Sequence, residues 1–156
     1  MRKILENNKK IEKEFESITN LNFYNELLKP TFIYHNVITQ ILEENLEIKG
    51  MSHITGGGLP ENLPRIIPTH LIPQLDLKSW DIPFIFNFLK DIGKIPDDDM
   101  WDTFNLGIGF CLIVNSKNKQ SILKICDLNN LDAFEIGRIS NKRDFQPQEI
   151  RRGIII

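Results

Sequence analysis

The chain has 156 residues, of which 41% are hydrophobic and 26% are charged, and its formal net charge at pH 7 is −2. These values are ordinary for a globular domain with one hydrophobic core, and they exclude a disordered chain. The charge balance provides no basic surface for nucleic acid or for an acidic membrane, so we expect neither as a partner.

The cysteine pattern and the length of the apolar runs indicate the cellular compartment of the protein. Cys111 and Cys126 form no Cys-x-x-Cys pair, and we expect two reduced thiols. No apolar run approaches the roughly 18 residues of a membrane helix, and the N-terminus passes directly into a charged segment without a signal peptide. We therefore expect a cytoplasmic protein that does not enter a membrane.

The first part of the chain is expected to be helical. Apolar residues near helical spacing predict an amphipathic helix over 2–18 with a charged, solvated face. A short helix or turn over 21–29 should end before Pro30, because a residue that precedes proline is displaced from the α region. A further helix is predicted over 35–45.

A glycine-rich loop follows the next predicted element, a strand over 48–54. The loop contains three consecutive glycines, Gly56–Gly58, which can adopt positive φ and approach a ligand closely. Pro60 suits the first turn of the next helix, which we place over 61–67. Free N–H groups at such a junction suit a phosphate or a developing oxyanion, and the structural alternative is a tight turn.

One of the three histidines stands beside this loop. His53 directly precedes it, where a ligand can reach the imidazole, although many single histidines are structural. His35 opens a predicted helix and His70 lies in a predicted turn. No histidine has metal-ligand spacing to another histidine or to a cysteine, so we expect no bound metal.

The middle of the chain contains a predicted strand over 71–76 and a helix over 84–92. Pro73 lacks a ladder donor, which places the strand at an edge or a bulge, and Gly93 is expected just beyond the helix end. The acidic run 97–99 suits either a hard cation or the start of a helix. We favour the helix start, where acidic groups cap and complement the dipole.

A second glycine pattern, Thr103–Gly109, precedes a predicted strand over 110–114. Its glycines suggest a strand that starts close to another backbone or to a ligand. A helix over 117–128 and a strand over 133–140 are expected next. The tail from residue 141 is either a last strand or a loose end.

Ser116 and Asn118 are the candidate N-caps of the predicted helix over 117–128. Helices and strands alternate irregularly along the chain, and no internal repeat is found. These patterns predict an α+β fold, specifically a three-layer α/β/α domain with a mixed sheet.

Four segments resemble the C-terminal half of the aminoimidazole ribonucleotide (AIR) synthetase family, the phosphoribosylformylglycinamidine cyclo-ligases of purine biosynthesis. They occur in the family's order, and the similarity extends over nearly the whole chain. The segments are Leu27–Tyr34, His53–Arg65, Thr103–Gly109 and Phe134–Ile139.

Phe32 departs from this family, which has a basic residue at that position. If the basic side chain normally helps to hold substrate, that contribution is in question here.

The resemblance implies an N-terminal half with the nucleotide-binding aspartates and the main dimer contacts. Residues 1–156 are therefore expected to be the C-terminal domain, from a truncated chain or a split gene, and to be inactive alone. ATP and Mg²⁺ are implied for the complete enzyme, bound mainly by the N-terminal half, with no cofactor in this part. The complete enzyme is expected to be a homodimer.

The implied reaction closes the imidazole ring of formylglycinamidine ribonucleotide and converts ATP to ADP and phosphate. His53 is the candidate for taking or orienting the amide proton, because histidine ionises near neutral pH. Arg65 has an alternative role in a salt bridge at a helix end. The residues expected to cradle or position substrate are Gly56, Gly57, Gly58, Asn62, Arg65 and Asn105.

Two alternative functions are considered. One is a related enzyme such as formylglycinamidine synthetase or thiamine-phosphate kinase, which the segment His53–Arg65 disfavours. The other is a catalytically silent binding or assembly module of the same fold. Because the domain lacks its partner half, we also expect exposed apolar surface near the glycine loop and the first helix, which favours association.

Overall fold

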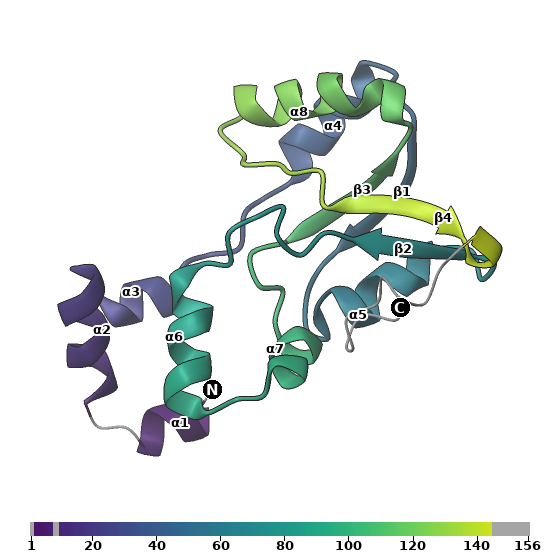
Figure 1. Cartoon of the computed structure of the whole chain (residues 1–156). Coiled ribbons are helices and arrows are strands. Elements are labelled where there is room, and N and C mark those ends of the chain that lie inside the picture. Colours follow the sequence, from purple (N-terminus) through teal and green to yellow (C-terminus); the bar gives the residue numbers. More distant parts are fainter. Residues whose placement is uncertain (1, 8–9, 145–156) are drawn as a thin grey trace.

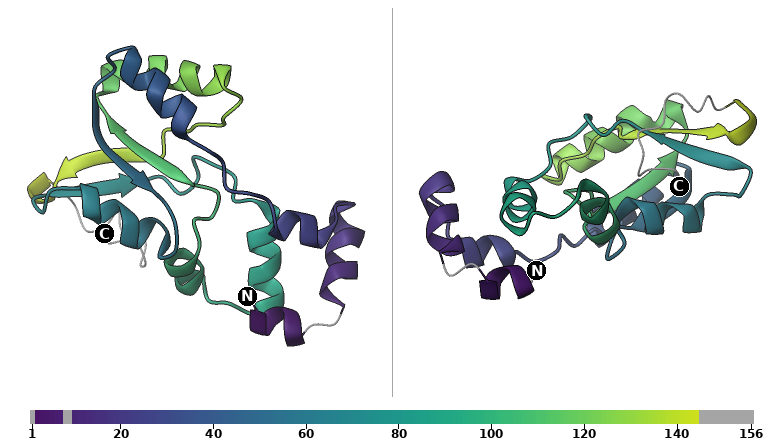
Figure 2. Two further views of the ribbon diagram at one scale, coloured as in Figure 1. Left: turned by 180° about the vertical axis from the view of Figure 1, so that it is seen from behind. Right: turned by 60° about the horizontal axis from the view of Figure 1, so that its bottom comes forward.

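A computed structural model describes residues 2–7 and 10–144 of the chain (Figure 1). Helices are combined with short antiparallel strand pairs, so the α+β class predicted from the sequence is confirmed. A group of helices lies beside the part that contains the strands, as the three views in Figures 1 and 2 show. Its members are α1 (Arg2–Asn7), α2 (Ile11–Thr19), α3 (Phe23–Leu27) and α6 (Phe84–Gly93).

This helical group has its own aromatic core. Phe15 is 1% exposed, and its ring centroid lies 5.3 Å from that of Phe23 and 5.1 Å from that of Phe88. The single helix predicted over 2–18 is instead two helices, the first of which, α1, ends at Asn7. α2 begins at Ile11.

The end of α6 differs from the expectation. Gly93 is the last residue of the helix, and the left-handed residue that follows is Lys94, with φ of 49°. A Cβ atom at Gly93 would lie 2.6 Å from Cδ1 of Ile4. Gly93 thus allows the Ile4 side chain of α1 to pack closely against the end of α6, and a side chain at this position would displace it.

The strands form two separate antiparallel pairs in the described residues, whereas the sequence predicts one mixed sheet. β1 (Ile48–His53) pairs with β3 (Phe110–Val114), and β2 (Leu71–Leu75) pairs with β4 (Gly137–Asn141). Pro73 lies within β2, which has one neighbouring strand, as predicted for an edge.

A cavity of about 1000 Å³ is lined by residues of both strand pairs.

The strand predicted over 133–140 is shorter and begins at Gly137. Beyond β4, the part of the tail that is described forms a short 3-10 turn, Lys142–Asp144, and the rest of the tail lies outside the described residues.

Helices cover both faces of the β1–β3 pair, so a three-layer arrangement exists around this pair. α4 (His35–Glu43) and α8 (Lys119–Leu128) pack on one face, where Leu112 joins their cluster. Cys111, the preceding residue of β3, joins a different cluster with Leu59 and Leu63. Neighbouring residues of a strand point to opposite faces, which explains this division.

The N-termini of the helices that begin near residues 97 and 119 differ in part from the sequence prediction. The run Asp97–Asp99 forms the first turn of α7 (Asp97–Thr103), where it complements the helix dipole, but the cap position is Pro96. Of the two predicted caps of α8, Asn118 is at the N-cap position but its side chain makes no capping hydrogen bond, and Ser116 instead begins a 3-10 turn, Ser116–Asn118. The Asn115 side chain, immediately after β3, accepts the Lys117 N–H at 3.1 Å, and a 3-10 turn leads from there into α8.

The described residues contain neither a membrane-spanning helix nor a cluster of metal ligands. No helix in residues 2–7 and 10–144 combines the length and apolar character needed to cross a membrane. Within the same ranges, no three His, Cys, Asp or Glu side chains are grouped in a way that would hold a metal ion.

Candidate functional site

The glycine loop begins where β1 ends. The Ile54 N–H donates to the Gly109 carbonyl at 2.9 Å, which continues the β1–β3 pairing one step past His53. The backbone then turns through Gly57, with φ of 86°, and Gly58, with φ of 54°. The next helix therefore starts earlier than predicted: α5 (Gly58–Asn62) is followed by a 3-10 turn, Leu63–Ile66.

The three glycines have different surroundings. A Cβ atom at Gly56 would meet nothing within 4 Å, whereas one at Gly58 would overlap the carbonyl oxygen of Trp101 and lie 2.7 Å from that of Phe104. A Cβ at Gly57 would contact the side chain of Glu61. Close packing against α7 therefore leaves no room for a side chain at Gly58, whereas the space beside Gly56 is open.

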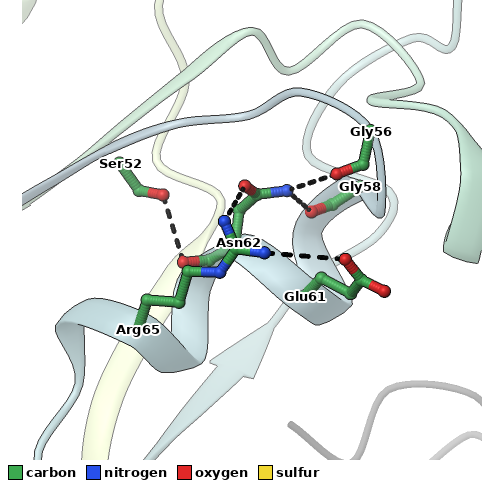
Figure 3. Close-up of polar contacts among 6 residues, drawn as sticks. All are labelled: Ser52, Gly56, Gly58, Glu61, Asn62 and Arg65. Carbon is green, nitrogen blue, oxygen red and sulfur yellow. Dashed lines mark hydrogen bonds and ion pairs between the residues drawn. The ribbon is translucent and has the colours of Figure 1, made fainter.

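The buried side chain of Asn62 stabilises this loop by hydrogen bonds to its backbone (Figure 3). Its side chain is 3% exposed, and Nδ2 donates to the carbonyl oxygens of Gly56 at 3.2 Å and Gly58 at 2.7 Å. The Ser52 hydroxyl donates to the Asn62 carbonyl at 3.2 Å. Both amide hydrogens of Asn62 are therefore used within the loop, and sequence reasoning did not identify this supporting role.

Arg65 lies on the exposed side of the same turn. Its guanidinium donates to Oδ1 of Asn62 at 3.3 Å and lies 3.6 Å from the Glu61 carboxylate (Figure 3). The helix-end salt bridge considered from the sequence is therefore present. Because both side chains are more than 60% exposed, this ion pair contributes little to stability, about 0.5 kcal/mol or less.

His53 is exposed at the end of β1 and is surrounded by aromatic rings. Its imidazole is stacked on Phe110 at a centroid distance of 6.0 Å and meets Tyr34 edge to face at 5.9 Å. Phe32 packs on Tyr34 at 5.2 Å. The structure therefore joins the segment Leu27–Tyr34 to the glycine loop. Sequence reasoning missed Tyr34 and Phe110, and the position of Tyr34 within that segment was the available signal.

Asn105 stabilises its own turn. Its Oδ1 accepts the Gly107 N–H at 3.3 Å, and the next carbonyl, of Leu106, accepts from Nε1 of Trp80 at 3.0 Å. Among the described residues, the side-chain hydrogen bond of Asn105 thus stays within the second glycine pattern. The structure brings His53, the glycines, Asn62 and Arg65 together through consecutive contacts, and Asn105 is not part of that chain of contacts.

Two ionisable groups near His53, the Cys111 thiol and the Tyr34 hydroxyl, have raised pKa values. Burial raises the pKa of the Cys111 thiol to about 12. Burial, and secondly the proximity of Cys111, raises the pKa of the Tyr34 hydroxyl. Both groups therefore stay protonated near neutral pH, and Tyr34 presents a neutral hydroxyl beside His53.

The raised pKa of Cys111 predicts a loss of stability in alkali. The folded protein disfavours the thiolate, so this contribution is complete below pH 9.0 and is lost as the pH rises toward about 12. Between pH 7 and pH 10.5 we expect the free energy of unfolding to fall by about 2 kcal/mol through this group alone. Urea unfolding at both pH values, compared with Cys111→Ala, measures the difference. An equal alkaline loss in the variant would contradict this assignment.

The fold and the site define a class of protein: an α+β domain with a preformed glycine loop at the end of a strand, next to an exposed histidine. The sequence matches the family described as AIR synthase related protein, C-terminal domain, over residues 5–149. The chain belongs to this family.

Curated relatives of the chain are named phosphoribosylformylglycinamidine cyclo-ligase. The protein from Prochlorococcus marinus (strain MIT 9312) is 59% identical over 92% of this chain and 42% of its own length. The protein from strain AS9601 is 60% identical over the same shares, and that from strain CCMP1986 is 53% identical over the whole chain and 45% of its own length. The chain therefore spans less than half of these relatives.

Proposed function

We propose that this chain is the C-terminal part of a phosphoribosylformylglycinamidine cyclo-ligase. In this proposal the complete enzyme is cytoplasmic and converts formylglycinamidine ribonucleotide to aminoimidazole ribonucleotide, with ATP as the second substrate. The identity of 59% to a protein of that name, across 92% of the chain, is the observation that carries the proposal.

The glycine loop would bind the phosphate of the substrate or the transferred phosphoryl group. Among the described residues, the N–H groups of Gly56 and Gly57 have no hydrogen-bond partner, while that of Gly58 donates to the Thr55 carbonyl at 3.1 Å. Preorganised N–H donors of this kind stabilise developing negative charge. Gly58 and Asn62 would shape the loop rather than touch the ligand.

His53 would take or orient the proton of the reacting amide. Its imidazole is exposed, and neither ring nitrogen has a hydrogen-bond partner among the described residues. Both nitrogens are therefore open to a substrate, which is the first geometric requirement for a general base. Arg65, exposed beside the loop, and Asn105, in the second glycine pattern, would help to position substrate.

The described residues do not fit Mg²⁺. The acidic run at the start of α7 is exposed, and Asp97 pairs with Nζ of Lys90 at 2.6 Å. No grouping of three potential ligands occurs in residues 2–7 and 10–144. In this proposal ATP and Mg²⁺ bind mainly to the remaining part of the complete enzyme, and no step through them is assigned to this domain.

That remaining part is also the proposed partner of an apolar surface. Leu28 is 77% exposed and Ile33 is 79% exposed, and both lie in the segment that joins α3 to α4, which also contains Tyr34. Burial of such side chains against another domain is favourable. We propose that the N-terminal half covers this segment and that the complete enzyme is a homodimer.

A coupled assay of ADP release tests the function. Formylglycinamidine ribonucleotide, ATP and Mg²⁺ are supplied to this chain alone, and to this chain mixed with the N-terminal part of the relative from strain MIT 9312. We expect turnover only in the mixture. Absence of turnover in both, despite a complex on size-exclusion chromatography, would favour a silent assembly module. Phe32, at a position that is basic in the family, is the observation that favours this second candidate.

A further inference from the structure

The Tyr34 ring joins three of the segments that form the site. It lies 5.9 Å from the His53 imidazole at an interplanar angle of 66° and 5.0 Å from the Phe110 ring at 39°. Tyr34 belongs to the segment before α4, His53 to the end of β1 and Phe110 to the start of β3. One half-buried aromatic ring thus connects residues that are far apart in the sequence.

Gly109 provides the space for this ring. A Cβ atom at Gly109 would overlap the hydroxyl oxygen of Tyr34 and lie 3.2 Å from its Cζ atom. The φ angle of Gly109 is outside the left-handed region, so no left-handed backbone conformation requires glycine there. Glycine at position 109 is therefore explained by the space that the Tyr34 hydroxyl occupies, and not by the backbone conformation.

The imidazole of His53 depends on ring contacts for its orientation. It contacts the rings of Tyr34 and Phe110, and among the described residues no hydrogen bond fixes either nitrogen. Edge-to-face and stacked aromatic pairs have a preferred geometry, so these two rings restrict the plane of the imidazole while leaving its nitrogens open.

We propose that Tyr34 is a positioning residue for His53, and that Gly109 is glycine in order to seat the Tyr34 hydroxyl. The proposal rests on the function proposed above for His53. It assigns the segment Leu27–Tyr34 a role in orienting the proton-transfer group, which differs from direct contact with substrate.

The atoms that surround Gly109 give a sharp rescue experiment. Gly109→Ala should displace the Tyr34 ring, because the new methyl group overlaps the hydroxyl oxygen. Tyr34→Phe removes that oxygen and leaves Cζ at 3.2 Å, a contact that a shift of a few tenths of an ångström relieves. The double variant Tyr34→Phe/Gly109→Ala should therefore restore the ring to its place.

The NMR signals of the His53 imidazole in the 156-residue chain report ring position without any assay of turnover. We expect Tyr34→Leu and Gly109→Ala to shift these ring-current-sensitive signals, and Tyr34→Phe and the double variant to keep them close to wild type. Tyr24→Phe, at an exposed position of α3, is the matched tyrosine control. The matching glycine control is Gly50→Ala, which adds a methyl within β1, where the nearest atoms are isoleucine side chains at 3.3 Å.

Kinetics of the mixture with the N-terminal part separate positioning from binding. We expect Tyr34→Leu and Gly109→Ala to lower kcat about tenfold to a hundredfold with little change in KM, and the double variant to recover most of the loss. Unchanged His53 signals in Gly109→Ala, or no recovery in the double variant, would overturn the proposal. Because the NMR result does not depend on turnover, loss of the catalytic role of His53 would be distinguished from loss of the Tyr34 contact.

Discussion

Replacement of Gly58 by alanine is expected to lower the free energy of unfolding by about 3 kcal/mol or more. A left-handed conformation costs a residue with a Cβ roughly 1 to 2 kcal/mol, and φ at Gly58 is 54°. The new methyl would also overlap the Trp101 carbonyl oxygen, a backbone atom that no side-chain rotation can move. Such overpacking adds roughly 1 to 3 kcal/mol. Urea unfolding followed by circular dichroism measures the loss.

Gly56→Ala is the matched control within the same loop. Nothing lies within 4 Å of its new Cβ, and its φ is outside the left-handed region, so we expect a change within about 0.5 kcal/mol. Gly57→Ala should fall between the two, because φ is 86° there but the contacting atoms belong to the Glu61 side chain. Equal stability of the Gly56 and Gly58 variants would contradict the packing of Gly58 against α7.

Replacement of His53 by alanine is expected to lower turnover of the complemented enzyme about a hundredfold or more. General acid–base catalysis by one side chain contributes typically 10² to 10⁴ in rate. His53 is exposed at the strand end, so its removal should leave the fold intact. The measurement is kcat for ADP release in the mixture with the N-terminal part, at saturating formylglycinamidine ribonucleotide.

His70→Ala is the control for this prediction. His70 is also exposed, and it lies before β2, outside the candidate site, where its carbonyl accepts the Lys142 N–H at 3.1 Å. That backbone bond survives the substitution, so turnover should remain at the wild-type level. If His53→Ala retains wild-type kcat, His53 has only a structural role.

Much of the secondary structure followed from local sequence patterns. The helices near 35–45 and 84–92 and the strands near 48–54 and 110–114 were predicted within a few residues of their observed bounds. The order of strand, glycine loop and helix around His53 was also predicted, because glycine and proline act locally on the backbone. Strand pairing was not, since the partners of β1 and β2 are separated from them by more than 50 residues.

The sequence by itself determined the α+β class, the family resemblance, and the positions of His53 and the glycine loop. The tertiary structure decided what each residue contacts. In the folded chain the Asn62 amide donates to the loop carbonyls, and Gly58 packs against α7. The Tyr34 ring lies against Gly109 and beside His53. These assignments depend on which distant backbone atoms come within van der Waals or hydrogen-bond distance, and no periodicity or spacing within one segment contains that information.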